Sequence, residues 1–275
     1  MGSALLITLR EGMEAALIVG IVLGVLTRLG QQRLKAAVWL GVGAAAVLSI
    51  VAGAILLAIG VRFEGTLEEA FEGTTMLLAA AMLTWMIFWM KHHGHQIARE
   101  LESETQAAVG RGQKALFGLA FFAVLREGLE TVLFLAAAMF QGDTASTLWG
   151  GLLGLAIAVG LGVLLFKSSL RLNLRAFFNV TGLLLLLVAA GLVAHGVHEL
   201  QEAGWLPVFI EHVWDTNPIL DENGSLGAFL KALFGYNGNP SLLEVVAYIT
   251  YLIVVGIAGK PKDVNLRRPS SAISA

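Results

Sequence analysis

Long runs of apolar residues dominate the chain, and the charged residues gather in the short intervals between these runs. A helix needs about 20 mostly apolar residues to cross the roughly 30 Å hydrocarbon core of a bilayer. Seven segments satisfy this requirement, at about 4–27, 36–61, 70–90, 115–140, 147–166, 176–198 and 242–259. The pattern therefore predicts an all-α polytopic membrane protein with seven transmembrane helices.

The composition supports this class. Of the 275 residues, 57% are hydrophobic and 14% are charged, and the mean hydropathy is +0.77. Soluble domains average about 25% charged residues, so a soluble enzyme and a disordered chain are excluded. The net charge of −2 argues against a nucleic-acid partner and leaves membrane lipid as the expected surroundings. The chain has no cysteine, which excludes disulfides, thiolate metal sites and cysteine nucleophiles.

Lys and Arg concentrate in alternate connections between the predicted helices, within 28–35, 91–114, 167–175 and 260–268. The other connections contain only Arg62 and Lys231. Because cytoplasmic loops are enriched in Lys and Arg, we expect the N-terminus outside and the C-terminus in the cytoplasm. The chain is then one transmembrane domain over residues 1–260, followed by a cytoplasmic tail over residues 261–275.

The long outer connection, at about 199–241, is acidic and carries several aromatic residues, which is typical of a segment at the membrane interface. At its end, Ser241 and Glu244 have the spacing of a capping box at the start of the seventh helix, about 242–259. We therefore interpret Glu244 as a helix cap and not as a metal ligand.

A short charged motif occurs twice inside apolar helices. Residues 9–14 read Leu-Arg-Glu-Gly-Met-Glu in the first predicted helix, and residues 125–130 read Leu-Arg-Glu-Gly-Leu-Glu in the fourth. The first helix runs inward and the fourth runs outward. This arrangement predicts two inverted three-helix repeats, at about 4–91 and about 115–200, with a site at their interface near the membrane midplane.

The motif charges favour a cation site. In each copy an Arg and a Glu are four residues apart and can pair, and two structural ion pairs are the alternative interpretation. Each charge at mid-bilayer costs roughly 3 kcal/mol, yet four Glu against two Arg leave a charge of −2. Clustered carboxylates select a hard cation. The expected ligands are Glu11, Glu14, Glu127 and Glu130.

The other motif residues are expected to organise these ligands. The two Arg side chains pair with the carboxylates, and the two Gly residues let the first and fourth helices approach closely. This group consists of Arg10, Arg126, Gly12 and Gly128.

Two further clusters lie at the outer ends of the third and sixth predicted helices. Glu72 falls about one turn inside the apolar span and is expected to be a further metal ligand. We expect an outer vestibule that collects cations, formed by Glu68, Glu69, His195, His198 and Glu199. The alternative for the two histidines is a favourable interaction with the C-terminus of their helix.

On the inner side, three histidines within residues 91–95 could accept an exiting metal, although a solvated loop is the interpretation that we favour there. These residues are His92, His93 and His95.

The paired motifs, at residues 10–14 and 126–130, resemble those of the oxidase-dependent iron permease family, which comprises fungal high-affinity ferric permeases and bacterial EfeU-like permeases. The likeness extends along most of the chain, including Phe71-Glu72-Gly73, Trp89-Met90, Trp214-Asp215 and Gly235-Tyr236. The length and the absence of large added domains are similar to the bacterial branch.

The resemblance implies an iron permease of the bacterial cytoplasmic (inner) membrane, and not an enzyme. It implies iron as the transported substrate, in the ferric form, with no bound organic cofactor. It also implies that the motif carboxylates handle the iron and that an extracytoplasmic partner oxidises or delivers it.

Two other functions stay open. The first is transport of another hard cation, such as Mn²⁺ or a proton-coupled cation, because carboxylate oxygen suits all of them. The second is an intramembrane di-iron enzyme, although such sites use Glu-x-x-His and both copies here have Glu-x-x-Glu. A purely structural membrane scaffold is a further alternative.

Overall fold

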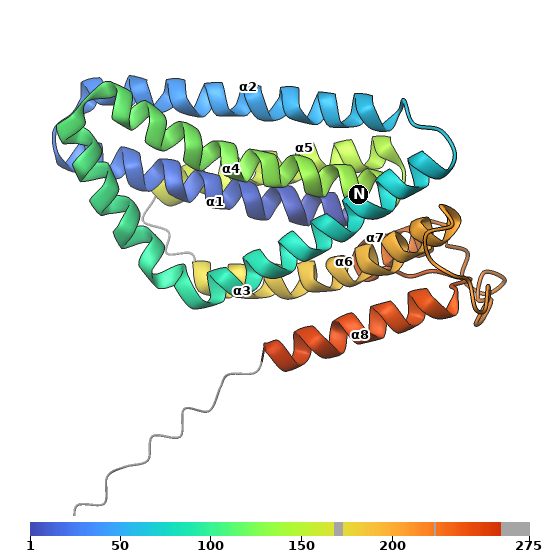
Figure 1. The fold of residues 1–275 in the computed structure, drawn as a ribbon. Helices are drawn as coiled ribbons and strands as arrows, with labels where there is room; N and C mark the ends of the chain where they lie inside the picture. The colour runs from blue at the N-terminus through green and yellow to red at the C-terminus, as the bar shows by residue number, and fades with distance from the viewer. Residues whose placement is uncertain (168–172, 223, 260–275) are drawn as a thin grey trace, which may run out of the picture.

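The computed structural model of the chain describes residues 1–167, 173–222 and 224–259 (Figure 1). The predicted tail over residues 261–275 and part of the connection after α5 lie outside the described residues. Within the described part the chain is helical and has no β-strand. The helices are α1 Gly2–Arg28, the short 3₁₀ turn η1 Gln32–Leu34, α2 Lys35–Gly60, α3 Thr66–Arg111, α4 Gln113–Phe140, α5 Thr144–Lys167, α6 Leu174–Glu202, α7 Ser225–Phe234 and α8 Leu242–Ala258.

Four helical segments of the described chain are long and apolar enough to cross a membrane. They are Gln32–Gly60, Thr66–Lys91, Thr144–Phe166 and Leu174–Glu202. Helices α1 and α4, with 27 and 28 residues, are equally long but carry the motif charges in their middle parts. Helix α8 is apolar and has 17 residues. The prediction of an all-α membrane protein is confirmed.

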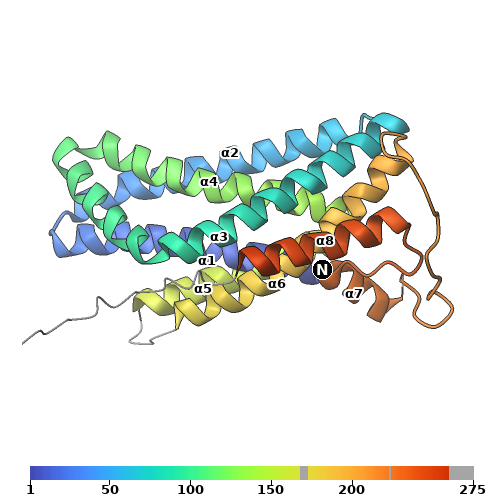
Figure 2. The same cartoon turned by 60° about the horizontal axis from the view of Figure 1, so that its bottom comes forward.

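Helix α3 is much longer than the pattern predicts. It contains 46 residues and continues past position 90 to Arg111, with a bend in its middle that Figures 1 and 2 both show. The expectation of a solvated loop here was wrong. Residues 96–109 are mostly strong helix formers, and Leu101 and Ala108 are buried in a cluster with Val22 and Leu26 of α1. The side chains of His92 and His95 lie outside the described part of the chain.

The helices pack in pairs that cross between the two halves of the sequence. Helix α1 lies along α5, α2 lies along α4, and α3 lies along α6 (Figures 1 and 2). Glycines bring backbones together in the first two pairs. A Cβ atom added at Gly41 of α2 would lie 2.6 Å from the carbonyl oxygen of Phe117 in α4, and one at Gly154 of α5 would lie 3.0 Å from the amide nitrogen of Leu9 in α1.

The largest buried apolar cluster lies between α3, α4 and α6, with a contribution from α1. Its members include Ile7, Met76, Leu83, Phe134 and Leu185. Because α1 and α4 both border this cluster and also contact each other, the two motif copies face a common region of the interior.

The outer connection contains a helix, α7, that the sequence pattern did not reveal. The rest of the connection is held by local hydrogen bonds: the hydroxyls of Thr216 and Tyr236 are 2.7 Å apart, and the Tyr236 hydroxyl donates to the carbonyl of Leu220 at 2.9 Å. At its end, Ser241 and Glu244 form the predicted capping box at the start of α8. The interpretation of Glu244 as a helix cap is confirmed.

The glycine contact between α2 and α4 generates a prediction about stability. Gly41→Ala should lower the free energy of unfolding by about 1–3 kcal/mol, because its methyl group must push two backbones apart. Gly43→Ala in the same helix is the matched control, since a Cβ there meets nothing within 4 Å. The control should be neutral or slightly stabilising, because Ala favours a helix. Thermal unfolding of both variants in detergent provides the measurement, and equal melting temperatures would contradict the packing.

Candidate metal site

The first motif copy forms a buried ion-pair network in the middle of α1. Arg10 and Glu11 are each 1% exposed. The Nη1 atom of Arg10 lies 3.0 Å from Oε1 of Glu11, and Nη2 lies 3.0 Å from Oε1 of Glu14. The predicted pair between Arg10 and Glu14 is therefore confirmed, and Glu11 is a second partner of the same guanidinium.

The second copy contains the corresponding pair in a more open environment. Arg126 donates through Nε to Oε1 of Glu130 at 2.9 Å, as the spacing predicts. Its side chain is 45% exposed, and the guanidinium carbon lies 5.4 Å from the centre of the Trp89 ring in α3. This distance is within the range of a cation–π interaction. Both arginines thus pair with the Glu four residues later, but Arg10 has a second carboxylate partner and is buried, whereas Arg126 is half exposed.

Three carboxylates from the two motif helices meet in one place. Glu11 and Glu14 of α1 and Glu127 of α4 each offer one oxygen atom, and these atoms all lie within 4.8 Å of one another. The Oε2 atoms of Glu11, Glu127 and Glu130 are buried without a hydrogen-bond partner. Buried polar atoms without partners are uncommon in folded proteins. A cation bound between α1 and α4 would provide these oxygens with a positively charged partner.

The two other predicted ligands differ in their position: Glu130 lies beside this group of carboxylates, and Glu72 does not. Glu130 interacts electrostatically with Glu11 and Glu14, so it borders the group. Glu72 instead interacts with Glu68 and Glu199. Along α3, Glu72 is 14 residues from Met86, which contacts Arg10, and this corresponds to about 21 Å. The structure therefore places Glu72 outside the central carboxylate group.

The motif glycines face different helices from those expected. A Cβ atom at Gly12 would lie 2.7 Å from Cβ of Ala158 in α5, and one at Gly128 would lie 2.8 Å from Cβ of Ser49 in α2. The expectation that these glycines bring α1 and α4 together was wrong. They instead let each motif helix approach the second helix of the other half, because that is where the absent side chains would collide.

Sequence reasoning missed the contribution of α3 to this site. The Nη1 atom of Arg10 lies 3.0 Å from the sulfur of Met86, and Nη2 lies 3.1 Å from the sulfur of Met90. Trp89, between them in sequence, lies against Arg126. The available signal was the spacing of these residues on one face of an apolar helix. That spacing is equally typical of core packing, so it did not identify the site.

The acidic residues predicted for the outer vestibule do come together. The first part of α3 approaches the last part of α6 closely, where a Cβ atom at Gly73 would lie 2.8 Å from the carbonyl oxygen of Gly196. Glu199 interacts electrostatically with Glu69 and Glu72 across this contact, and Glu72 also interacts with Glu68. Carboxyl groups from both helices therefore gather at these two helix ends.

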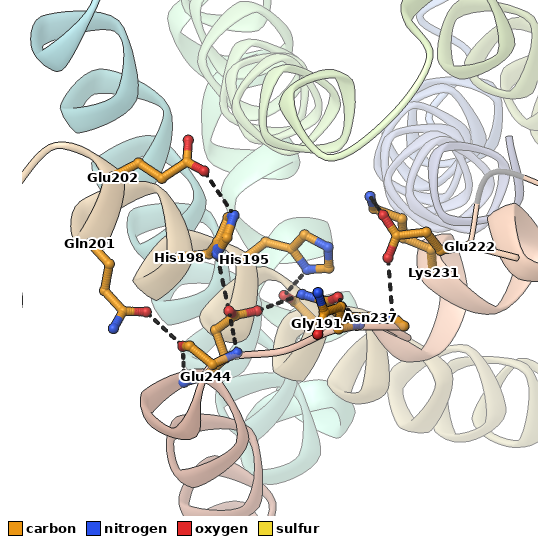
Figure 3. A network of polar contacts seen from close by, with 12 residues as sticks. Gly191, His195, His198, Gln201, Glu202, Glu222, Lys231, Asn237 and Glu244 are labelled. Carbon is orange, nitrogen blue, oxygen red and sulfur yellow. Dashed lines mark hydrogen bonds and ion pairs between the residues drawn. The ribbon is translucent and has the colours of Figure 1, made fainter. Parts of the chain in front are cut away.

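The two histidines of α6 make their hydrogen bonds elsewhere (Figure 3). His198 lies 3.0 Å from Glu244 through Nδ1 and 3.2 Å from Glu202 through Nε2. The Nδ1 atom of His195 is 3.0 Å both from the carbonyl oxygen of Gly191 and from the side-chain nitrogen of Gln141. The predicted vestibule is thus divided into an acidic part and a histidine-containing network.

Glu244 is the centre of that network. Its Oε2 accepts from the side-chain amide of Asn237 at 2.8 Å, and its Oε1 accepts from the backbone amide of Ser241 at 2.9 Å and contacts His198 (Figure 3). Ser241 also donates to Gln201 of α6 at 2.7 Å. These bonds attach the start of α8 to α6 and to the outer connection.

Comparisons with known proteins assign the family. A model described as the iron permease FTR1 family matches residues 1–259. A protein of Escherichia coli named ferrous iron permease EfeU is 41% identical over 259 residues, which cover 92% of this chain and 93% of that protein. A protein of Yersinia pestis with the same name is 39% identical over 251 residues, which cover 90% of this chain and 89% of that protein. No solved structure matches the chain significantly.

The chain therefore belongs to the iron permease FTR1 family. The resemblance stated from the two motifs is confirmed, and so is the assignment to transporters and not to enzymes, because the relatives are named as permeases. Iron is the substrate that this family membership implies. The predicted location in the bacterial inner membrane agrees with the family and with the long apolar helices.

The network around Glu244 generates a prediction that separates a structural histidine from a metal-binding one. His198→Ala should lower the melting temperature, with a loss of roughly 1–3 kcal/mol, because a buried carboxylate loses a partner. His212→Ala is the control, since His212 is exposed in the outer connection. Thermal unfolding should be measured with and without iron. If His198→Ala lowered the melting temperature only in the presence of iron, the structural role of His198 would be contradicted.

Proposed function

We propose that this chain passes iron across the cytoplasmic membrane through the carboxylates of its two motif helices. The observation that carries the proposal is the meeting of Glu11, Glu14 and Glu127 within 4.8 Å, with contributions from both α1 and α4. Glu130 borders the group and completes the set. Such a site needs α1 and α4 to stay in contact, so an ion bound there is held by both halves of the chain.

We further propose seven transmembrane helices, with α1–α3 and α4–α6 as two inverted repeats and α8 as the seventh. The packing supports this arrangement. Exchanging the repeats converts the α1–α5 pair into the α4–α2 pair, and it leaves the α1–α4 and α3–α6 pairs unchanged. The glycine contacts follow the same exchange, because Gly12 faces α5 and Gly128 faces α2. The distribution of Lys and Arg supports an outer N-terminus.

For the oxidation state, we propose Fe²⁺ in place of the ferric form that the sequence resemblance implies. The four motif Glu and two Arg carry a charge of −2 when all are ionised, which a divalent ion neutralises. The relatives are named ferrous iron permeases, and two thioether sulfurs lie at the site. Soft sulfur ligands suit Fe²⁺ better than the harder Fe³⁺.

We also propose an extracytoplasmic protein that delivers Fe²⁺, in place of the oxidising partner that the resemblance implies, and an acidic outer surface that receives the ion. The acidic surface consists of Glu68, Glu69, Glu72 and Glu199 at the ends of α3 and α6. Acidic groups raise the local concentration of cations over about 8 Å at physiological salt. We assign no metal ligand to His198, because both of its ring nitrogens contact carboxylates, one of them the central Glu244. His195 is not part of that network: its Nδ1 contacts Gln141 and Gly191, and the proposal gives it no role in binding iron.

The carboxylate site predicts the effect of removing single charges. Glu11→Gln, Glu14→Gln, Glu127→Gln and Glu130→Gln should each reduce iron uptake at least about tenfold, because an amide is a weaker ligand for a hard cation. The measurement is radioactive iron uptake in cells that lack other iron transporters. Glu100→Gln, at an exposed position of α3, is the matched control and should transport as the parent does. Normal uptake by any two of the four variants would refute the site.

The ion pairs predict a difference between the two arginines. Arg10→Lys should lose most of the iron uptake, because an ammonium group cannot bridge Glu11 and Glu14 as the planar guanidinium does. Arg126→Lys should lose less, since Arg126 has one carboxylate partner and a half-exposed side chain. Initial uptake rates of both variants, at equal protein levels in the membrane, give the comparison. Parent-like uptake by Arg10→Lys would contradict the bridging role.

A further inference from the structure

Four acceptor atoms enclose the guanidinium of Arg10. Two are carboxylate oxygens, from Glu11 and Glu14, at 3.0 Å. The other two are the thioether sulfurs of Met86 and Met90, at 3.0 and 3.1 Å. Each terminal nitrogen therefore lies between one oxygen from α1 and one sulfur from α3.

This arrangement suits a guanidinium poorly. Arginine carries five N–H donors and is best satisfied by oxygen acceptors, whereas a thioether sulfur is a weak acceptor. The Nε atom of Arg10 is buried and has no hydrogen-bond partner. The guanidinium of Arg10 is therefore contacted only through its two terminal nitrogens, and partly by sulfur. Its hydrogen-bonding requirements do not explain its position in the structure.

We propose that Met86 and Met90 are ligands of the transported ion, which takes the place of the Arg10 guanidinium between the carboxylates and the sulfurs. The inference rests on the proposed function and deepens it. Arg10 then acts as a tethered cation that keeps this place filled until an ion displaces it. The exchange needs only side-chain movement, because the methionine chains are unbranched and adaptable.

The sulfur atoms give the site a basis for selecting its ion. Carboxylates alone accept Fe²⁺, Mn²⁺, Mg²⁺ and Ca²⁺ with little discrimination by ligand type, whereas thioether ligands favour softer ions. Fe²⁺ also precedes Mn²⁺ in affinity for sites with nitrogen, oxygen or sulfur ligands. A mixed set of motif carboxylate oxygens and two sulfurs should therefore prefer Fe²⁺ to Mn²⁺, which has the same charge.

The test is the ratio of Fe²⁺ to Mn²⁺ uptake by the full chain in proteoliposomes, with ascorbate to keep iron reduced. Met86→Leu, Met90→Leu and the double variant remove sulfur while nearly conserving volume. The ratio of initial rates at low ion concentration should fall about fivefold for each single variant, as expected for the loss of one weak ligand, and further for the double variant. Met76→Leu is the control, because Met76 is buried in the apolar cluster of the same helix.

The outcomes separate the inference from the proposed function. An unchanged ratio in the double variant would overturn the inference, whether or not both rates fall, because methionines that only position Arg10 would affect the two ions equally. X-ray absorption at the iron edge of the loaded parent gives a second measurement. A sulfur shell that disappears in the double variant supports the inference, and an oxygen-only shell in the parent refutes it. A parent that transports no iron would refute the proposed function itself.

Discussion

The fold depends on one constraint: two apolar helices must each accommodate an Arg and two Glu near the middle of their length. A charge in the hydrocarbon region is unfavourable unless it is paired and shielded from lipid. Helices α1 and α4 turn their motif carboxylates toward each other, which places Glu11, Glu14 and Glu127 within 4.8 Å. Arg126 stays 45% exposed and is paired with Glu130. The remaining helices are arranged around the contact between α1 and α4, and the excess negative charge makes it a site for a cation.

Small residues make the surrounding packing possible. Each motif glycine lies against the second helix of the other half, at Ala158 of α5 and Ser49 of α2. Larger side chains at these positions would collide with α5 and α2 and disturb the two helix pairs that hold the motif helices in place. The same positions that form the chemical motif therefore also set the distance between helices, so the motif has both a structural and a chemical part.

Much of the architecture was predictable from the sequence, because apolar length and i,i+4 charge spacing act locally. The helix positions, the pairs of Arg10 with Glu14 and of Arg126 with Glu130, and the Glu244 cap all follow from such local rules. The rest depends on tertiary contacts. Helix α3 continues past residue 90 because its later residues are buried against α1. Gly12 faces the helix that packs beside it, which the sequence does not identify. The α3 methionines contact Arg10, which is 76 or 80 residues away in the sequence.

The central claim is that one ion is shared by both motif helices, and equilibrium binding of Fe²⁺ to the purified chain tests it most directly. The account predicts one saturable ion per chain, and it predicts that Glu14→Gln and Glu127→Gln each remove this same ion. Two ions per chain, of which each variant removes only its own, would show that the motifs bind iron separately. That result would contradict the shared site.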